Sequence, residues 1–232
     1  MPTQIPLHFE FRADQSFAHY HAGANAEAVA CLTRLAEGTG ESLIFLWGDA
    51  GLGKTHILQA CCQHAHQLGA NALYLPLHKM RRYGAELLDG LDSVEVACID
   101  DIETIIGDDA WEIAFFNFFN RSRDRGHRLV VAANSAPADL GIRLPDLQSR
   151  LAWGLTLRLQ PLGDDDKLAA ITLKARHMGL ELSPRVGRFL LAHYPRDLPS
   201  LWALLSRLDH ASLAAKRKLT LPFIKEYLEN EP

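Results

Sequence analysis

Residues 48–55 read Gly-Asp-Ala-Gly-Leu-Gly-Lys-Thr, which matches the G-x-x-x-x-G-K-[ST] pattern of a phosphate-binding loop. Glycines let such a loop wrap around an anion, and successive backbone N–H groups then point inward. The Lys54 ammonium suits the β- and γ-phosphates, and the Thr55 hydroxyl suits Mg²⁺. The residues expected to hold nucleotide here are Gly48, Asp49, Ala50, Gly51, Leu52, Gly53, Lys54 and Thr55, with His56 following.

Two acidic residues follow a second apolar run and could complete a magnesium site. Asp100 and Asp101 end the run 94–99, which is the pattern of a Walker B strand. Asp100 is placed to bind Mg²⁺, and Asp101 to orient an attacking water. Asn134 ends the next strand and could contact the γ-phosphate or that water. Alternatively, Asp100 and Asp101 are only solvated acids after a strand, and Asn134 is only a turn former.

The segments that flank the loop are those that a phosphate loop requires. The apolar run 42–47 predicts a buried strand before it, and 56–62 predicts a helix after it. A glycine-rich turn that binds nothing is the alternative, and this strand–loop–helix context disfavours it.

Strands and helices alternate along the first two thirds of the chain. This alternation predicts an α/β domain with a parallel, doubly wound sheet. Further strands are expected at 72–75, 94–101, 129–134 and 155–159, and further helices at 25–37, 78–88 and 111–123.

The pattern changes after Pro161, where helical segments follow one another without strands. They span 164–177, 183–194, 198–214 and 221–228, with Asp164 and Ser183 as expected N-caps. We therefore expect three parts. These are an N-terminal arm (1–12), a nucleotide-binding α/β domain (13–162) and a smaller all-helical lid domain (163–232).

Composition limits the class of protein. The net charge of −4, with 48% hydrophobic and 22% charged residues, fits a packed soluble protein that does not bind polyanions over its whole surface. The four cysteines show no C-x-x-C pairing, which favours buried free thiols. No apolar run reaches the roughly 20 residues of a membrane span, and residues at the start of the sequence show neither the basic n-region nor the apolar h-region of a secretory signal. We expect a cytoplasmic protein without membrane contact.

A more distinctive run spans residues 144–154, Leu-Pro-Asp-Leu-Gln-Ser-Arg-Leu-Ala-Trp-Gly. This run resembles box VII of the DnaA family of AAA+ replication proteins. It is most similar to the shorter Hda-type members, which act in the regulatory inactivation of DnaA. Gln160-Pro161-Leu162 and residues 217–220, Arg-Lys-Leu-Thr, also look Hda-like. The resemblance covers essentially the whole chain.

The resemblance implies an AAA+ fold that binds ADP or ATP with Mg²⁺, and it suggests roles for three residues. Arg150 matches the arginine finger, which reaches a nucleotide on a neighbouring subunit; a surface ion pair is the alternative. Arg196 matches the sensor 2 arginine, although an ungapped alignment places Pro199 there instead. Phe17 matches the adenine-side box, with a core aromatic residue as the alternative.

The N-terminal arm contains residues 4–9, Gln-Ile-Pro-Leu-His-Phe, which resemble the bacterial sliding-clamp-binding motif. In that motif Gln4 would hydrogen-bond at the rim of an apolar pocket, and Leu7 and Phe9 would fill it. An amphipathic start of a strand is the alternative.

The leading function is regulatory. The resemblance implies a protein that binds adenine nucleotide, docks on the DNA sliding clamp and uses Arg150 to stimulate ATP hydrolysis by DnaA, which prevents re-initiation. We expect an activator of a partner's ATPase more than a robust ATPase. The rival is a self-contained AAA+ ATPase, such as a helicase or clamp loader, and a third class is an adaptor that binds no nucleotide.

Partners other than DnaA and the clamp are less clearly indicated. We expect neither the initiator's helix-turn-helix domain nor its oligomerisation domain, and a homo-oligomer stays open. The basic runs at 121–128 and 216–218 indicate solvated faces, so contact with DNA is expected to be indirect or weak.

Overall fold

The computed structural model describes residues 15–229, except the side chains of the last two, and divides them into two compact units. The first unit holds residues 15–17 and 25–160, and the second holds 18–24 and 161–229. The first unit ends at residue 160, two residues before the predicted end of the nucleotide-binding domain, and the segment 18–24 groups with the second unit. His21 Nε2 lies 2.9 Å from Asp166 Oδ1, and the His19 ring packs edge-on against His177.

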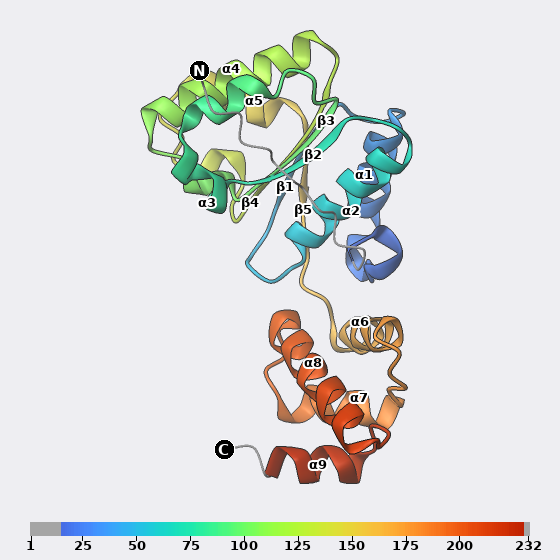
Figure 1. Cartoon of the computed structure of the whole chain (residues 1–232). Coiled ribbons are helices and arrows are strands. Elements are labelled where there is room, and N and C mark those ends of the chain that lie inside the picture. Colours follow the sequence, from blue (N-terminus) through green and yellow to red (C-terminus); the bar gives the residue numbers. More distant parts are fainter. Residues whose placement is uncertain (1–14, 230–232) are drawn as a thin grey trace. The chain divides into compact units, whose positions relative to one another are not determined.

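A five-stranded parallel sheet forms the centre of the first unit (Figure 1). The strand order is β2-β3-β4-β1-β5, and every neighbouring pair is parallel. Their apolar composition fits burial on both faces, as parallel sheets require. The strands are β1 (Leu43–Trp47), β2 (Ala72–Pro76), β3 (Val96–Asp100), β4 (Arg128–Ala133) and β5 (Leu155–Arg158). The predicted parallel α/β domain is confirmed.

Helices cover both faces of this sheet. Figure 1 shows α1 and α2 on one face and α4 and α5 on the other. The helices are α1 (Ala26–Glu37), α2 (Lys54–Gln67), α3 (Leu77–Met80), α4 (Asp109–Asp124) and α5 (Pro145–Trp153). Short 3₁₀ turns span Phe17–His19, Gly23–Asn25, Arg81–Tyr83, Ala85–Gly90, Ile102–Thr104 and Pro137–Asp139.

The helix predicted over residues 78–88 is wrong. The chain forms only the one-turn helix α3 there, followed by two 3₁₀ turns separated by Gly84. Gly84 has φ 86° and ψ 159°, a conformation that is essentially restricted to glycine and cannot continue a helix. A glycine inside the expected helix was the signal against it.

The second unit is all-helical, as predicted. It contains α6 (Asp164–His177), α7 (Pro184–His193), α8 (Leu198–Ala215) and α9 (Leu221–Glu229). Buried aliphatic side chains join these helices, among them Ile171, Leu190, Leu201, Leu205, Leu208 and Ile224.

One of the two predicted caps in this unit is present. The Ser183 hydroxyl accepts a hydrogen bond from the Val186 amide and caps α7. Asp164 is instead the first residue of α6, after Gly163, so its prediction as a cap is wrong. Its carboxylate still lies in the first turn, where the helix dipole favours negative charge.

Two expectations from composition can be compared with the structure. All four cysteines, Cys31, Cys61, Cys62 and Cys98, are free and buried, which confirms the prediction of buried thiols. Within residues 15–229, no helix combines the length and the apolar character that crossing a bilayer requires.

Candidate nucleotide-binding site

The phosphate loop joins the carboxyl end of β1 to the start of α2. Gly51 and Gly53 have φ values of 82° and 90°, which side-chain-bearing residues rarely adopt, so glycine is required at both positions. In the described part of the chain, no acceptor bonds the amides of Gly51, Gly53 and Thr55. These N–H groups are therefore available to phosphate oxygens at the positive end of the helix dipole.

Lys54 lies at the centre of the site and is only 7% exposed. Its ammonium donates to the carbonyls of Gly48 at 2.5 Å and Asp49 at 2.9 Å, and to Asn134 Oδ1 at 2.8 Å. Burial lowers the pKa of Lys54, and nearby carboxylates, Glu103 first among them, oppose that shift. A phosphate group would bring the negative charge that a buried ammonium lacks.

Asp100 ends β3 and is almost fully buried. Its Oδ2 accepts hydrogen bonds from the Thr55 hydroxyl at 2.7 Å and the Tyr74 hydroxyl at 2.8 Å. Burial raises the pKa of Asp100, and these two hydrogen bonds act in the opposite direction. Burial, followed by the neighbouring Asp100 carboxylate, raises the pKa of Tyr74, which keeps its hydroxyl a donor. Tyr74 was not predicted from the sequence.

The same carboxylate fits a magnesium ion. Asp100 Oδ1 is buried and has no hydrogen-bond partner in the described structure, which is rare for a buried polar atom. Mg²⁺ takes hard oxygen ligands and commonly combines one or two protein groups with waters and phosphate oxygens. Asp100 and Thr55 can supply the protein ligands of such a site. Within the described residues, no cluster of three or more His, Cys, Asp or Glu could hold a metal without such help.

Asp101 lies next to this site but its carboxylate is already paired. Its Oδ2 lies 2.5 Å from His78 Nδ1. Its backbone has φ 59°, one of two positive values among the described non-glycine residues. Strained conformations of this kind cluster at functional sites. The sequence predicted Asp101 as the residue that orients water, but it did not identify His78 as its partner.

Glu103 is a further residue of this site that the sequence did not predict. The Asn134 amide donates to Glu103 Oε1, and its own carbonyl oxygen accepts from Lys54. Glu103 Oε2 is buried with no partner in the described residues, and burial raises the pKa of this carboxyl group. Asn134 thus joins the lysine of the phosphate loop to a third acid, in a set that can position water beside a phosphate.

Two further predicted residues are found at α2: Phe17 packs against this helix, and His56 is part of it. The Phe17 ring contacts His64 edge-on with 6.0 Å between the ring centroids, and Phe17 is half-buried. His56 Nε2 lies 3.0 Å from the carbonyl oxygen of Ser16, so the start of the described chain is tied to the helix that follows the phosphate loop. This position is compatible with both the adenine-side role and the packing role.

Arg150 lies on α5, apart from the residues that surround Lys54. It is half-buried, and it forms no hydrogen bond or ion pair with any described residue. Trp153, one turn later, is 66% exposed and lines a surface depression with Leu43 and Leu129. Those two residues begin or nearly begin β1 and β4, so the end of α5 lies at the amino edge of the sheet. The phosphate loop follows the opposite, carboxyl edge.

A buried carboxylate holds α5 in place. Glu112, on α4, is 1% exposed and accepts hydrogen bonds from the amides of Gly107 at 2.8 Å, Arg143 at 3.0 Å and Leu144 at 2.8 Å. Leu144 is the residue before the first turn of α5. Glu112 therefore fixes the helix that carries Arg150, and sequence reasoning did not identify it.

Arg196 lies in the second unit, in the turn between α7 and α8. Its guanidinium donates to the Leu191 carbonyl at 3.0 Å and to Asp164 Oδ2 at 3.2 Å. Pro199 lies in the first turn of α8. The predicted clamp-binding residues Gln4, Leu7 and Phe9 lie outside the described residues.

Comparison with known proteins gives consistent matches. Residues 12–158 match the family model of the bacterial DnaA ATPase domain, and residues 164–228 match that of the Hda lid domain. The fold is similar to domain III of the replication initiation protein DnaA from Thermotoga maritima. The TM-score is 0.84 at 22% identity, over 96% of this chain and 98% of that one.

Two other structures share the fold. For AMPPCP-bound DnaA from Aquifex aeolicus, the TM-score is 0.74 at 22% identity, over 86% of this chain and 66% of that one. For a variant of RuvB from Thermotoga maritima, the TM-score is 0.71 at 18% identity, over 95% of this chain and 73% of that one.

Proposed function

The chain belongs to the bacterial DnaA ATPase family of AAA+ proteins and is Hda-like in its lid, and on this basis we propose that it regulates the replication initiator DnaA. In this proposal it binds an adenine nucleotide, docks on the DNA sliding clamp through its N-terminal arm, and presents Arg150 to ATP held by DnaA. Stimulated hydrolysis then prevents re-initiation.

The observation that carries this proposal is the state of Arg150. A guanidinium with no partner in the described residues stands on the box VII-like helix, beside an exposed tryptophan. Arginine and tryptophan are the side chains that most often dominate protein interfaces. A planar guanidinium suits the charge that spreads over a transferring phosphoryl group. An arginine finger acting on a neighbouring protein explains both features.

The nucleotide in the chain's own site has a structural role in this proposal. AMPPCP, an adenine nucleotide analogue, is bound in the Aquifex relative, and the free amides of Gly51 and Gly53, together with Lys54, supply matching chemistry here. Asp100 and Thr55 would hold Mg²⁺ against the phosphates. Binding only to the folded protein would stabilise it by about 2.7 kcal/mol at a hundredfold excess over Kd.

Replacing Asp100 with asparagine tests the magnesium site. An amide can still accept from Thr55 and Tyr74, but it removes the negative charge and the free carboxylate oxygen that a cation requires. We expect the gain in nucleotide affinity on adding Mg²⁺ to fall by at least roughly tenfold, since even groups behind the direct ligands contribute that much. Nucleotide titrations with Mg²⁺ and with EDTA measure it.

The matched control is Asp89→Asn. The Asp89 side chain is 69% exposed and, among the described residues, pairs only with Arg121 at the surface. It should leave both titrations unchanged. A full magnesium effect in Asp100→Asn would place the cation on other ligands.

The clamp-binding role rests on the sequence of residues 4–9. We expect Gln4→Ala with Leu7→Ala to abolish clamp binding and to leave nucleotide affinity unchanged. Truncating an interface anchor costs about 2 kcal/mol or more, which is roughly thirtyfold in Kd for each residue. Surface plasmon resonance on immobilised clamp measures the loss, with Thr3→Ala as the control. Wild-type affinity in the double variant would refute the assignment.

The second candidate is a self-contained AAA+ ATPase that acts as a helicase or clamp loader. Three acids, Asp100, Asp101 and Glu103, lie around Lys54, and this arrangement could support hydrolysis in the chain's own site. Robust ATP turnover by the purified protein alone would favour this function. Failure to bind any nucleotide would favour a pure adaptor.

The decisive experiment measures ATP hydrolysis by DnaA on clamp-loaded DNA with and without this protein. The proposal predicts that hydrolysis rises only when the clamp and this protein are both present. An unchanged rate would refute the regulatory function.

A further inference from the structure

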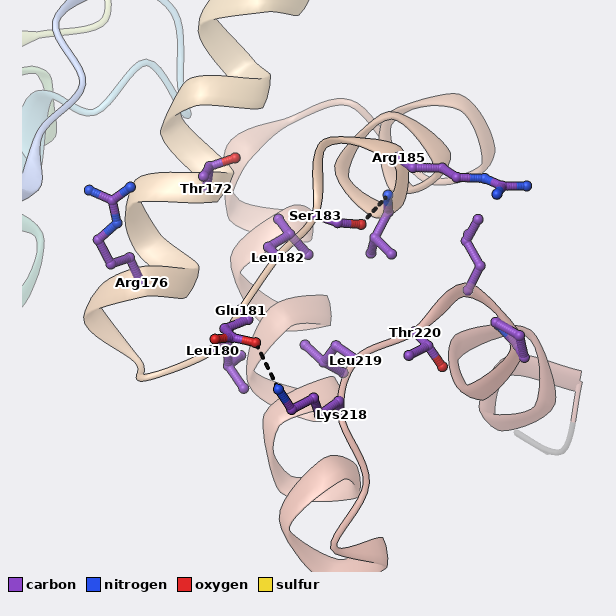
Figure 2. Close-up of a pocket in the computed structure, with 13 residues that line it drawn as sticks. Thr172, Arg176, Leu180, Glu181, Leu182, Ser183, Arg185, Lys218, Leu219 and Thr220 are labelled. Atoms are coloured by element: carbon purple, nitrogen blue, oxygen red, sulfur yellow. Dashed lines mark hydrogen bonds and ion pairs between the residues drawn. The ribbon is translucent and has the colours of Figure 1, made fainter.

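The second unit contains an open groove of about 600 Å³ that no step of the proposed function uses. Figure 2 shows it between α6, the segment that leads into α7, and the segment that leads into α9. Aliphatic side chains form its apolar part, among them Leu180, Leu182, Val186 and Leu219. Leu182, Val186 and Leu219 also belong to the buried core of this unit, so the floor of the groove is continuous with that core.

The rim of this groove is positively charged. Arg176 and Arg185 line it, both are exposed, and neither has a hydrogen bond or ion pair with the described residues. Lys218 pairs with Glu181 at 3.2 Å, and both of these side chains are 84% exposed. The charged residues of the groove are therefore three cations and one carboxylate, and of these only Lys218 and Glu181 pair with each other in Figure 2. Helices α7 and α9 also begin at the groove, and their amino ends add partial positive charge to its rim.

The backbone in the walls of the groove has unused hydrogen-bonding groups. The residues 180–183 and 218–220 that line it are non-helical. In the described structure, the amides of Glu181, Leu182 and Leu219 donate to no acceptor. Backbone amides without a protein acceptor along an open groove are free to bond water or a ligand. An extended peptide is a ligand that can pair with them while placing alternate side chains in a cavity.

We propose that this groove binds an extended segment of a protein partner in which apolar side chains alternate with carboxylates. The apolar side chains occupy the leucine-lined floor, and the carboxylates lie against Arg176, Arg185 and Lys218. The aliphatic floor argues against a free phosphate. None of the described residues that line the groove is aromatic, so a single nucleic acid strand would find no surface there on which to stack its bases. This docking site goes beyond the contact through Arg150.

The test uses the full chain and three pools of synthetic peptides of about eight residues, long enough for four side chains on one face. Alternate positions carry Leu, Ile, Val or Phe. The intervening positions carry Asp or Glu in the first pool, Ser in the second and Lys in the third. We expect the chain to retain the acidic pool at least about tenfold more strongly than the other two. Equal retention of all three pools, or retention of none, would overturn the proposal.

The best acidic peptide is then labelled and titrated by fluorescence anisotropy. Arg176→Glu with Arg185→Glu should weaken its binding at least about tenfold, and added salt should weaken binding to the wild-type chain by screening. Both replaced residues lack partners in the described structure, so the fold should remain intact. Arg188→Glu is the matched control, because Arg188 is an exposed arginine of α7 that does not line the groove. Unchanged affinity in the double variant would overturn the assignment.

This result is separable from the regulation of DnaA. Loss of peptide binding in the double variant, with normal stimulation of DnaA in the absence of any peptide, supports a second docking site. A wild-type chain that binds acidic peptides but does not stimulate DnaA would refute only the proposed function.

Discussion

Replacing Arg150 with alanine is expected to give a folded, nucleotide-bound protein that no longer stimulates ATP hydrolysis by DnaA. An arginine finger supplied by a neighbouring protein contributes on the order of 10³–10⁵ in rate in systems where it is measured. The loss of stimulation should therefore be almost complete. A surface ion pair, by contrast, would contribute only about 0–1 kcal/mol to stability.

The structure explains why the fold should survive this change. Arg150 has no hydrogen bond or ion pair with the described residues, so its removal leaves no buried group without a partner. Helix α5 is held by other contacts. Glu112 binds the backbone at its start, and Leu147 and Leu151 are fully buried on its inner face. We expect the free energy of unfolding to change by no more than about 0.5 kcal/mol.

Hydrolysis of DnaA-bound ATP on clamp-loaded DNA measures the effect. Arg150→Lys should also fail, because an ammonium cannot reproduce the planar fork of donors. Arg123→Ala is the matched control, since Arg123 lines the same depression as Trp153 and its side chain pairs, within residues 15–229, only with its neighbour Asp124. Near-wild-type stimulation by Arg150→Ala would show that the protein acts as a scaffold.

Sequence patterns predicted most of the architecture because its elements depend on local signals. Apolar runs identified every strand of the sheet, and helical periodicity identified all four helices of the second unit. The failure at residues 78–88 has the same origin, because periodicity outweighed a single glycine, Gly84. Helix α5 was likewise read as a motif and not as an element, although Pro145 suits the first turn of a helix.

The meeting of the residues at the centre of the candidate nucleotide site was also predictable. A phosphate loop after one strand and acids after another must meet at the carboxyl edge of a parallel sheet. Thr55 and Asp100 do so across a 2.7 Å hydrogen bond, and Lys54 meets Asn134 at 2.8 Å.

The supporting residues of the site could not be predicted in the same way. Tyr74 bonds Asp100, which is 26 positions away in the sequence, and Glu103 bonds Asn134, which is 31 positions away. Glu112 lies within a strongly apolar helix, and only the packed structure shows the three amides that it binds. A buried acid without a nearby basic residue in the sequence is a weak signal, because its partners are backbone groups that every segment carries.

The second large effect is expected for Lys54→Ala, which should abolish nucleotide binding at ordinary concentrations. Truncating one partner of a buried, hydrogen-bonded charge pair costs about 2–5 kcal/mol. That range corresponds to a loss of roughly thirtyfold to several thousandfold in affinity. Calorimetric titration with ADP and with ATP measures it.

The thermal response provides a second measurement. At a nucleotide concentration of about a hundred times Kd, the wild-type protein gains about 2.7 kcal/mol. For a chain of this size the gain raises Tm by roughly 5–10 °C. Lys54→Ala should lose this rise. Lys79→Ala, which removes an exposed lysine of α3, should retain it.

Without nucleotide, the two terms that Lys54 contributes to stability oppose each other. Its ammonium satisfies the carbonyls of Gly48 and Asp49 and the amide oxygen of Asn134, but burial disfavours its charge, as its lowered pKa shows. The variant should therefore differ from wild type mainly when nucleotide is present. Unchanged affinity for both nucleotides would mean that the loop does not bind phosphate. A large loss of stability without nucleotide would show that the hydrogen bonds of Lys54 outweigh the cost of burying its charge.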